Sequence, residues 1–172
     1  MCDALDVSVH RGSEHDVLSR YHEAALKCDA EVVVRMTSDC PVIDPQVSDM
    51  VVRRFLEHAP ALDYATNGIP RSRPVGLDTE VMRMEALDIA AREADDPYDC
   101  EHVSPFLYRQ PNRFRILSVV SDTDLSHHRW TLDEWGDYEL LRRIIEALYP
   151  DNPTFGHRDI IGLLADHPDW SE

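Results

Sequence analysis

Apolar and polar positions along the chain form blocks that predict helices and strands in turn. Over His15–Cys28 the apolar residues recur at helical spacing, and Glu31–Met36 follows with three consecutive valines. Such a run is typical of a strand buried on both faces of a parallel sheet, so we expect all three valines to be buried. Pro45–His58 reads as the next helix, with Asp44 as its N-cap.

The same patterning continues to the end of the chain. It predicts short strands at Val7–His10, Asp63–Thr66, Thr79–Arg83, Phe114–Ser121 and Arg129–Leu132, and helices at Glu85–Glu93, Asp96–Gln110, Glu134–Tyr149 and Arg158–Asp166. Strands that alternate with helices indicate an α/β sandwich with a mostly parallel sheet, to which the region 114–132 adds an antiparallel element. No repeat or low-complexity linker interrupts residues 1–172, which we therefore interpret as a single domain.

Charge narrows the choice of partner. The chain has 33 acidic and 17 basic residues, a formal net charge of −16. A surface this acidic repels nucleic acids and anionic membranes, so neither is expected as a partner. An anionic ligand then requires a bound cation or a local arginine cluster. Lys27 is the only lysine, a bias that fits either a GC-rich genome or a salt-adapted cytoplasm.

Cysteine usage and the N-terminal sequence predict a cytoplasmic protein. Cys2, Cys28, Cys40 and Cys100 form no C-x-x-C pair, which favours reduced thiols over disulfides or a zinc site. The first fifteen residues lack the apolar segment of a signal peptide, and no apolar run approaches the roughly 20 residues of a membrane span.

Two aspartates occupy positions where carboxylates often do chemistry. Asp39 follows the valine-rich strand, and Asp133 follows the predicted strand Arg129–Leu132. Ligands of open α/β sheets bind beyond the carboxyl ends of strands, and Mg²⁺ prefers one or two carboxylates plus phosphate oxygens. The alternative interpretation is structural, with Asp39 as a turn residue and Asp133 as a helix cap.

Other polar residues offer weaker signals. Arg71 and Arg73 lie in a loop rich in proline, where they would either bind a substrate carboxylate or phosphate or balance surface acids. His102 and the pair His127-His128 are candidates for acid–base work or for plain packing. Asp122-Thr-Asp124 matches the D-x-D pattern of glycosyltransferases, which is weak evidence in a chain with 21 aspartates.

Taken together, these segments resemble the cytidylyltransferase family that includes spore-coat polysaccharide biosynthesis proteins and, more distantly, CMP-sugar-acid synthetases. The resemblance covers almost the whole chain in order. The residues that carry it are His10-Arg11-Gly12-Ser13, Asp16-Val17-Leu18, Arg20-Tyr21, Val33-Val34-Arg35, Asp39-Cys40-Pro41, Ile43-Asp44-Pro45, Asn67, Pro70-Arg71, Gly76-Leu77-Asp78, Glu80-Val81, Asp96-Pro97-Tyr98, Glu101-His102-Val103, Pro105, Asp124-Leu125-Ser126-His127, Arg129-Trp130-Thr131 and Asp133.

The resemblance implies a three-layer α/β/α nucleotide-diphospho-sugar transferase fold. It also implies Mg²⁺-dependent transfer of CMP from CTP to a sugar or sugar acid for surface polysaccharide biosynthesis, with Asp39 and Asp133 as the catalytic and metal-binding carboxylates. By the same resemblance the nucleotide-binding residues are Arg11, Gly12, Ser13 and Asp16, and the substrate-binding residues are Asn67, Arg71, Asp78, His102 and Arg129.

One part of the family pattern is missing. Members begin with a strand and a basic loop of the form R-x-x-S-x-R-L-P-x-K that wraps the triphosphate, and these 172 residues contain neither. Three explanations stay open: a mis-called start or fragment, a degenerate non-catalytic relative, or a half-enzyme completed by another chain. We therefore expect residues 1–172 to be nearly inactive alone, and to work as a homodimer or with a complementing N-terminal chain. A glycosyltransferase that uses Asp122 and Asp124, or a non-catalytic subunit, are the alternative functions.

Overall fold

The computed structural model describes residue 5 and residues 7–171. Cys2, whose thiol was predicted to be reduced, lies outside the described residues. The chain forms two compact units that interleave in sequence. The first comprises Met1–Val33, His58–Tyr64 and Val81–Ile116, and the second comprises Val34–Glu57, Ala65–Glu80 and Leu117–Glu172. The interpretation of residues 1–172 as a single domain stays a prediction.

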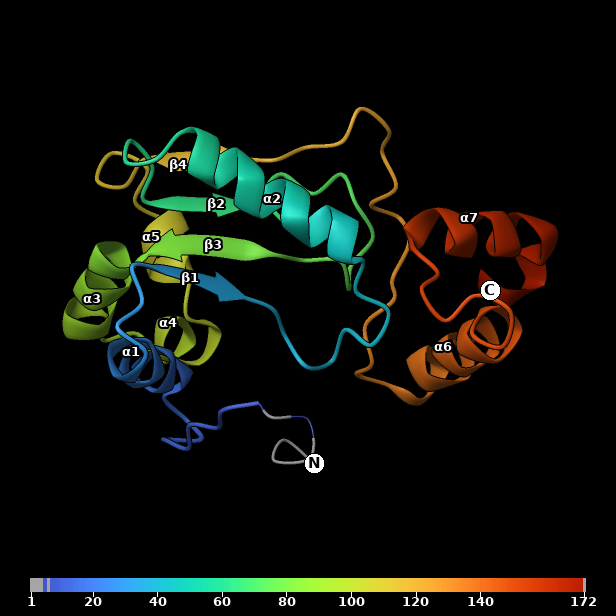
Figure 1. Cartoon of the computed structure of the whole chain (residues 1–172), viewed down its shortest axis with the longest axis horizontal. Coiled ribbons are helices and arrows are strands. Elements are labelled where there is room, and N and C mark those ends of the chain that lie inside the picture. The colour runs from blue at the N-terminus through green and yellow to red at the C-terminus, as the bar shows by residue number, and fades with distance from the viewer. Residues whose placement is uncertain (1–4, 6, 172) are drawn as a thin grey trace. The chain divides into compact units, whose positions relative to one another are not determined.

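The first unit is built around four helices, α1 (Val17–Lys27), α3 (Met84–Glu93), α4 (Pro97–His102) and α5 (Pro105–Tyr108), seen together in Figure 1. Helix α1 begins two residues after the predicted start at His15, because Asp16 caps it by accepting a hydrogen bond from the Ser19 backbone N–H. Its buried Leu18 and Ala25 join a core that includes Tyr64, Met82 and Leu87.

The second unit contains α2 (Pro45–Glu57), α6 (Trp135–Leu148), α7 (His157–Asp166) and a closing 3₁₀ turn, η2 (Pro168–Ser171). Asp44 caps α2 as predicted, accepting hydrogen bonds from the backbone of Gln46 and Val47. The apolar faces of α6 and α7 meet in a core around Trp130, which is 1% exposed, with Leu141, Ile144, Ile160 and Leu164.

Four strands form one sheet in the order β1-β3-β2-β4: β1 (Val32–Arg35), β2 (Tyr64–Thr66), β3 (Glu80–Arg83) and β4 (Ile116–Ser118). Three of these four described strands run in one direction and β3 runs against them (Figure 1). The mixed α/β class predicted from the sequence is confirmed. The antiparallel element is β3, however, whereas the predicted region 114–132 supplies β4, which pairs with β2 in parallel.

The three valines of β1 are not all buried, contrary to the prediction. Val34 is 38% exposed, and Val32 and Val33 are only half-buried. The reason lies in the sheet order, because β1 has a described neighbour, β3, on one side only. A run of valines indicates a preference for strand structure, but it does not predict whether the strand pairs with other strands on one side or on both.

Three further element predictions need correction. Val7–His10 has no regular structure, and Arg129–Leu132 contributes a single bridge between Val75 and Arg129 in place of a strand. The helix predicted over Asp96–Gln110 is two short helices, because Val103 takes a positive φ of 72° and Pro105 follows.

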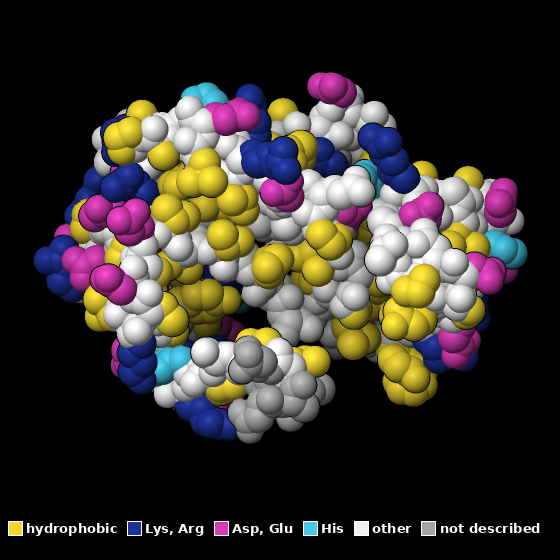
Figure 2. Space-filling view, viewed as in Figure 1, with side chains coloured by type: hydrophobic (Ala, Val, Ile, Leu, Met, Phe, Trp, Pro, Cys, Tyr) yellow, Lys and Arg dark blue, Asp and Glu magenta, His cyan; other side chains and the backbone are white. Residues whose placement is uncertain are grey.

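Acidic and basic side chains are interspersed on the face drawn in Figure 2, and hydrophobic side chains lie between them. In the part of the chain that the structure describes, no helix is long and apolar enough to cross a bilayer.

Candidate active site

Asp39 lies in the turn that follows β1, where the sequence placed it. The Cys40 thiol contacts its carboxylate at 3.6 Å, and Thr37 in turn contacts the Cys40 sulfur at 3.2 Å. Burial raises the pKa of Asp39, but hydrogen bonds, led by that of the Thr37 side chain, outweigh it and leave this pKa below its ordinary value. Asp39 is therefore a half-buried carboxylate that stays ionised at neutral pH.

The Asp39 turn is tied to the segment that leads into α6. The Asp39 backbone carbonyl accepts a hydrogen bond from the Leu132 backbone N–H at 2.8 Å and one from the Thr131 hydroxyl at 3.3 Å. Asp133 is the next residue along the chain. The structure therefore brings the two predicted carboxylate residues to neighbouring backbone positions within the second unit.

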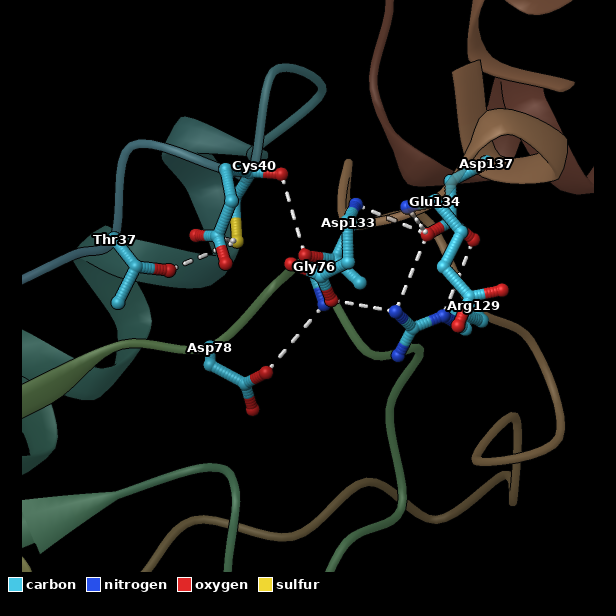
Figure 3. Close-up of polar contacts among 10 residues, drawn as sticks. Thr37, Cys40, Gly76, Asp78, Arg129, Asp133, Glu134 and Asp137 are labelled. Carbon is cyan, nitrogen blue, oxygen red and sulfur yellow. Dashed lines mark hydrogen bonds and ion pairs between the residues drawn. The ribbon is translucent and has the colours of Figure 1, made fainter. Parts of the chain in front are cut away.

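Asp133 does not cap α6, which was the structural alternative for this residue. Its carboxylate is half-exposed and accepts a hydrogen bond from Arg129 at 2.5 Å. The capping acceptor is Asp137, whose carboxylate receives the backbone N–H groups of Asp133 and Glu134 and also binds Arg129 (Figure 3). Arg129 thus bridges the carboxylates of Asp133 and Asp137. Of these two, only Asp137 takes part in capping the helix.

The loop 67–79 holds three more predicted site residues, and internal hydrogen bonds occupy all three. Asn67 is 1% exposed, donates to the Leu77 carbonyl at 2.7 Å and accepts from the Thr79 backbone N–H at 2.8 Å. Arg71 donates to both carboxylate oxygens of Asp78, at 2.8 and 3.1 Å. A role for Asn67, Arg71 and Asp78 toward the substrate stays a prediction.

This loop is fixed against the segment that carries Arg129 and Asp133. Val75 donates to the His128 carbonyl and accepts from the Trp130 backbone N–H, at 3.0 and 2.7 Å. Gly76 has a φ of 102°, and a Cβ there would lie 2.5 Å from the Trp130 carbonyl oxygen. Only glycine fits this contact.

The remaining predicted site residues belong to the first unit. Two hydrogen bonds fix the turn before α1. The Asp16 backbone N–H donates to the Ser13 hydroxyl at 3.0 Å, and Arg20 donates to the Ser13 carbonyl at 3.1 Å. Arg11 and Gly12 precede this turn and are exposed. His102 is exposed at the end of α4, its ring 4.2 Å from that of Tyr98. Their assignment to nucleotide and substrate also stays a prediction.

The donor set around Asp39 fits a metal that arrives with phosphate oxygens better than a closed protein site. Among the described residues, no group of three or more His, Cys, Asp or Glu side chains is arranged to hold an ion. Mg²⁺ is commonly held by one or two carboxylates, with waters and substrate phosphates filling the octahedron. The D-x-D alternative gains no support, because Asp124 accepts the Ser126 backbone N–H in a local turn.

Sequence reasoning missed two residues that shape this site. Asp137 anchors Arg129, and its position three residues after Glu134, at the start of a predicted helix, was an available capping signal. Glu80 on β3 pairs with Arg35 on β1 at 2.5 Å. Only the pairing of those two strands reveals this ion pair.

Comparisons with known proteins identify the class to which this mixed α/β fold belongs, a cytidylyltransferase of the nucleotide-sugar transferase fold. A family model described as Cytidylyltransferase matches residues 1–161. The chain is 33% identical over 170 residues to an uncharacterized protein of Methanocaldococcus jannaschii, covering 98% of this chain and 67% of that protein. It is 30% identical over 175 residues to the spore coat polysaccharide biosynthesis protein SpsF of Bacillus subtilis, covering 98% and 69%.

A solved structure gives the same answer. A cytidylyltransferase from Leptospira borgpetersenii superimposes with a TM-score of 0.93 at 30% sequence identity, covering 98% of this chain and 70% of that one. The chain belongs to the cytidylyltransferase family, and it spans about two thirds of the length of these relatives.

Proposed function

We propose that the chain supplies the metal and acceptor side of a site that transfers CMP from CTP to a sugar or sugar acid. One observation carries the proposal: the hydrogen bond between Leu132 and the Asp39 carbonyl, which sets Asp39 beside the segment that presents Asp133. Membership of the cytidylyltransferase family supplies the class of reaction. The name of the relative SpsF, a spore coat polysaccharide biosynthesis protein, points to a sugar-derived acceptor.

In this reaction an acceptor oxygen attacks the α-phosphorus of CTP and pyrophosphate leaves. Such transfers depend on alignment of the reactants and on neutralisation of the phosphate charge. Asp39 and Asp133 are the residues that would hold Mg²⁺, and the bound ion would offset negative charge on the triphosphate. The lowered pKa of Asp39 keeps its carboxylate available as a ligand at neutral pH.

Arg129 has two functions in this proposal. It pairs with Asp133, and it is held in place by Asp137 through two hydrogen bonds of 3.1 and 3.2 Å. If Asp133 held a cation, Arg129 would still be anchored by Asp137 and would be available to bind a phosphate or the acceptor. Its guanidinium is suited to bind a carboxylate or phosphate of either reactant.

The phosphates need more positive charge than this site provides. Arg71 and Arg129 already pair with carboxylates, and the chain carries a net charge of −16. We infer that the remaining cations come from Mg²⁺ and from a basic segment of the kind that the family resemblance implies.

The test is pyrophosphate release from CTP with Mg²⁺ and a panel of sugars and sugar acids. It uses residues 1–172 joined to the basic phosphate-binding segment of the family. Asp39→Asn and Asp133→Asn should each lower kcat/KM by about 100-fold or more, because each removes a charged metal ligand.

The matched control is Asp122→Asn, an equal change of charge at an exposed aspartate of the same unit. It should leave the rate within about twofold, because exposed charges away from a site contribute little. Loss of activity in Asp122→Asn with retention in Asp39→Asn would overturn the proposal in favour of the D-x-D alternative.

A further inference from the structure

A cavity lies in the second unit, apart from the Asp39 turn. It has a volume of about 470 Å³ and is bounded by α2, the loop after β4 and the first turns of α7. None of its lining residues is among those that the family resemblance assigns to CMP transfer, although Arg73 was a candidate for binding an anionic substrate group. The volume falls within the usual range of small-molecule sites.

Arg73 lines this cavity without a carboxylate partner. Its Nε is buried and has no hydrogen-bond partner among the described residues, and one terminal nitrogen contacts the Met50 sulfur at 3.8 Å. Burial lowers the pKa of Arg73, and the charge of Asp44 offsets this in part. Arginine nevertheless remains protonated in proteins, so one residue of the cavity wall carries a guanidinium cation with donors to spare.

The lining of this cavity carries positive charge, whereas the protein as a whole has a net charge of −16. Arg158 and His157 line the cavity together with Arg73, and no acidic side chain of the described residues is part of the lining. Asp44, whose charge raises the pKa of Arg73, is itself buried, with 3% of its surface exposed. Its carboxylate is already engaged, because one oxygen accepts from Gln46 and Val47 and the other accepts twice from His157.

Two helices add to the positive field. Gln46 and Val47 belong to the first turn of α2, and His157 and Arg158 to the first turn of α7. The N-terminal ends of helices carry partial positive charge that favours an anion, and Asp44, which accepts from the first turns of both helices, offsets this charge in part.

The rest of the lining fits a ligand that carries hydroxyl groups. Ser121, Thr123 and Gln46 supply polar groups, while Val47, Leu125 and Ile161 supply apolar walls. Ser121 accepts a hydrogen bond from the Thr123 backbone, which leaves its O–H free to donate. We propose that this cavity binds a small organic oxyanion of about monosaccharide size, a phosphate monoester or a carboxylate, with Arg73 as the principal ligand.

The test is an NMR titration of ¹⁵N-labelled protein that follows the Arg73 Nε–H signal, assigned by its loss in Arg73→Gln. The probes are inorganic phosphate, glucose 6-phosphate and glucuronate. At least one of the two sugar-sized probes should shift the signal in a saturable manner. Arg73→Gln should weaken binding by about tenfold or more, because a charge-assisted hydrogen bond is lost. The phosphate and carboxylate arms distinguish the two ligand classes.

The matched control is Arg53→Gln, which removes the same charge from an exposed arginine of α2 that pairs with Asp49 at 2.7 Å. It should leave the affinity within about twofold. Asp39→Asn should also retain binding, so failure of the CMP-transfer proposal and failure of this one are distinguishable.

Three results would overturn the proposal. Equal weak binding by wild type, Arg73→Gln and Arg53→Gln would indicate an adventitious ion only. Saturable binding that Arg73→Gln leaves unchanged would place the anion elsewhere. Arg73-dependent binding of inorganic phosphate without either sugar-sized probe would contradict the size of the ligand. Thermal unfolding of each variant checks that it is folded.

Discussion

The backbone N–H of Leu132 donates to the backbone carbonyl of Asp39 at 2.8 Å, across 93 positions of sequence. Together with the bond from the Thr131 hydroxyl to the same carbonyl, it joins the turn after β1 to the segment before α6. It makes two acidic residues that are far apart in sequence neighbours in space.

Gly76→Ala should destabilise the protein by about 2–3 kcal/mol, because a Cβ at a φ of 102° would meet the Trp130 carbonyl oxygen at 2.5 Å. Urea unfolding measures the change. Gly162→Ala in α7 is the matched control, since nothing lies within 4 Å of its Cβ position. There the substitution should stabilise by about 0.5–1 kcal/mol, and equal effects at both sites would contradict the described loop contact.

Asp44→Asn should cost about 2 kcal/mol at pH 7, because charge-assisted hydrogen bonds to the starts of α2 and α7 are weakened. Burial raises the pKa of Asp44, but hydrogen bonds led by that of the His157 backbone leave it below its ordinary value.

A lowered folded-state pKa gives stability that is present above the unfolded-state value, about 3.9, and is lost as the pH falls through the folded-state value. The stability difference between wild type and Asp44→Asn should therefore shrink below about pH 4. Urea unfolding between pH 3 and pH 7 measures it. A difference that grows on acidification would show that the sign of this pKa shift is wrong.

Arg129→Gln should strengthen binding of Mn²⁺, used as a probe for Mg²⁺, by about fivefold, because the competing cation on Asp133 is removed. The same variant should lower CTP turnover, because the anchored guanidinium no longer contacts a reactant. Electron paramagnetic resonance of free Mn²⁺ gives the affinity. Weaker Mn²⁺ binding in Arg129→Gln would argue against Asp133 as a ligand.

Residues 1–172 alone should release pyrophosphate from CTP at about 1% or less of the rate of the same residues joined to the basic segment of the family. The reason is that Arg71 and Arg129, the arginines of the proposed site, already pair with carboxylates and leave little positive charge for a triphosphate. The comparison should be made at low and at molar salt, because the acidic composition fits a salt-adapted protein. Equal turnover in both forms would contradict this account of the phosphates.

Local patterns predicted the features that depend on neighbours in sequence. The helical spacing of apolar residues located α1, α2, α6 and α7 to within a few residues, and the Asp44-Pro45 start of α2 was read correctly. Asp39 was placed at the end of its strand by the same reasoning.

Features that depend on residues far apart in the sequence could not be predicted from local patterns. The exposure of Val34 follows from the edge position of β1, and the Arg35–Glu80 pair follows from the β1–β3 pairing. The internal pairing of Arg71 with Asp78 was also not foreseen, although both lie in one loop, because loop conformation decides which charges meet. Arg73 lies two residues away, and its Nε has no hydrogen-bond partner among the described residues.

The central claim, CMP transfer that depends on Asp39 and Asp133, is tested most directly by ³¹P NMR of the products formed from CTP, Mg²⁺ and a sugar-acid panel. The protein used is residues 1–172 joined to the basic segment. The account predicts pyrophosphate and a new phosphodiester signal in equal amounts, both lost in Asp39→Asn and Asp133→Asn and both retained in Asp122→Asn. Formation of CDP and inorganic phosphate, or pyrophosphate release that survives in Asp39→Asn and Asp133→Asn, would contradict it.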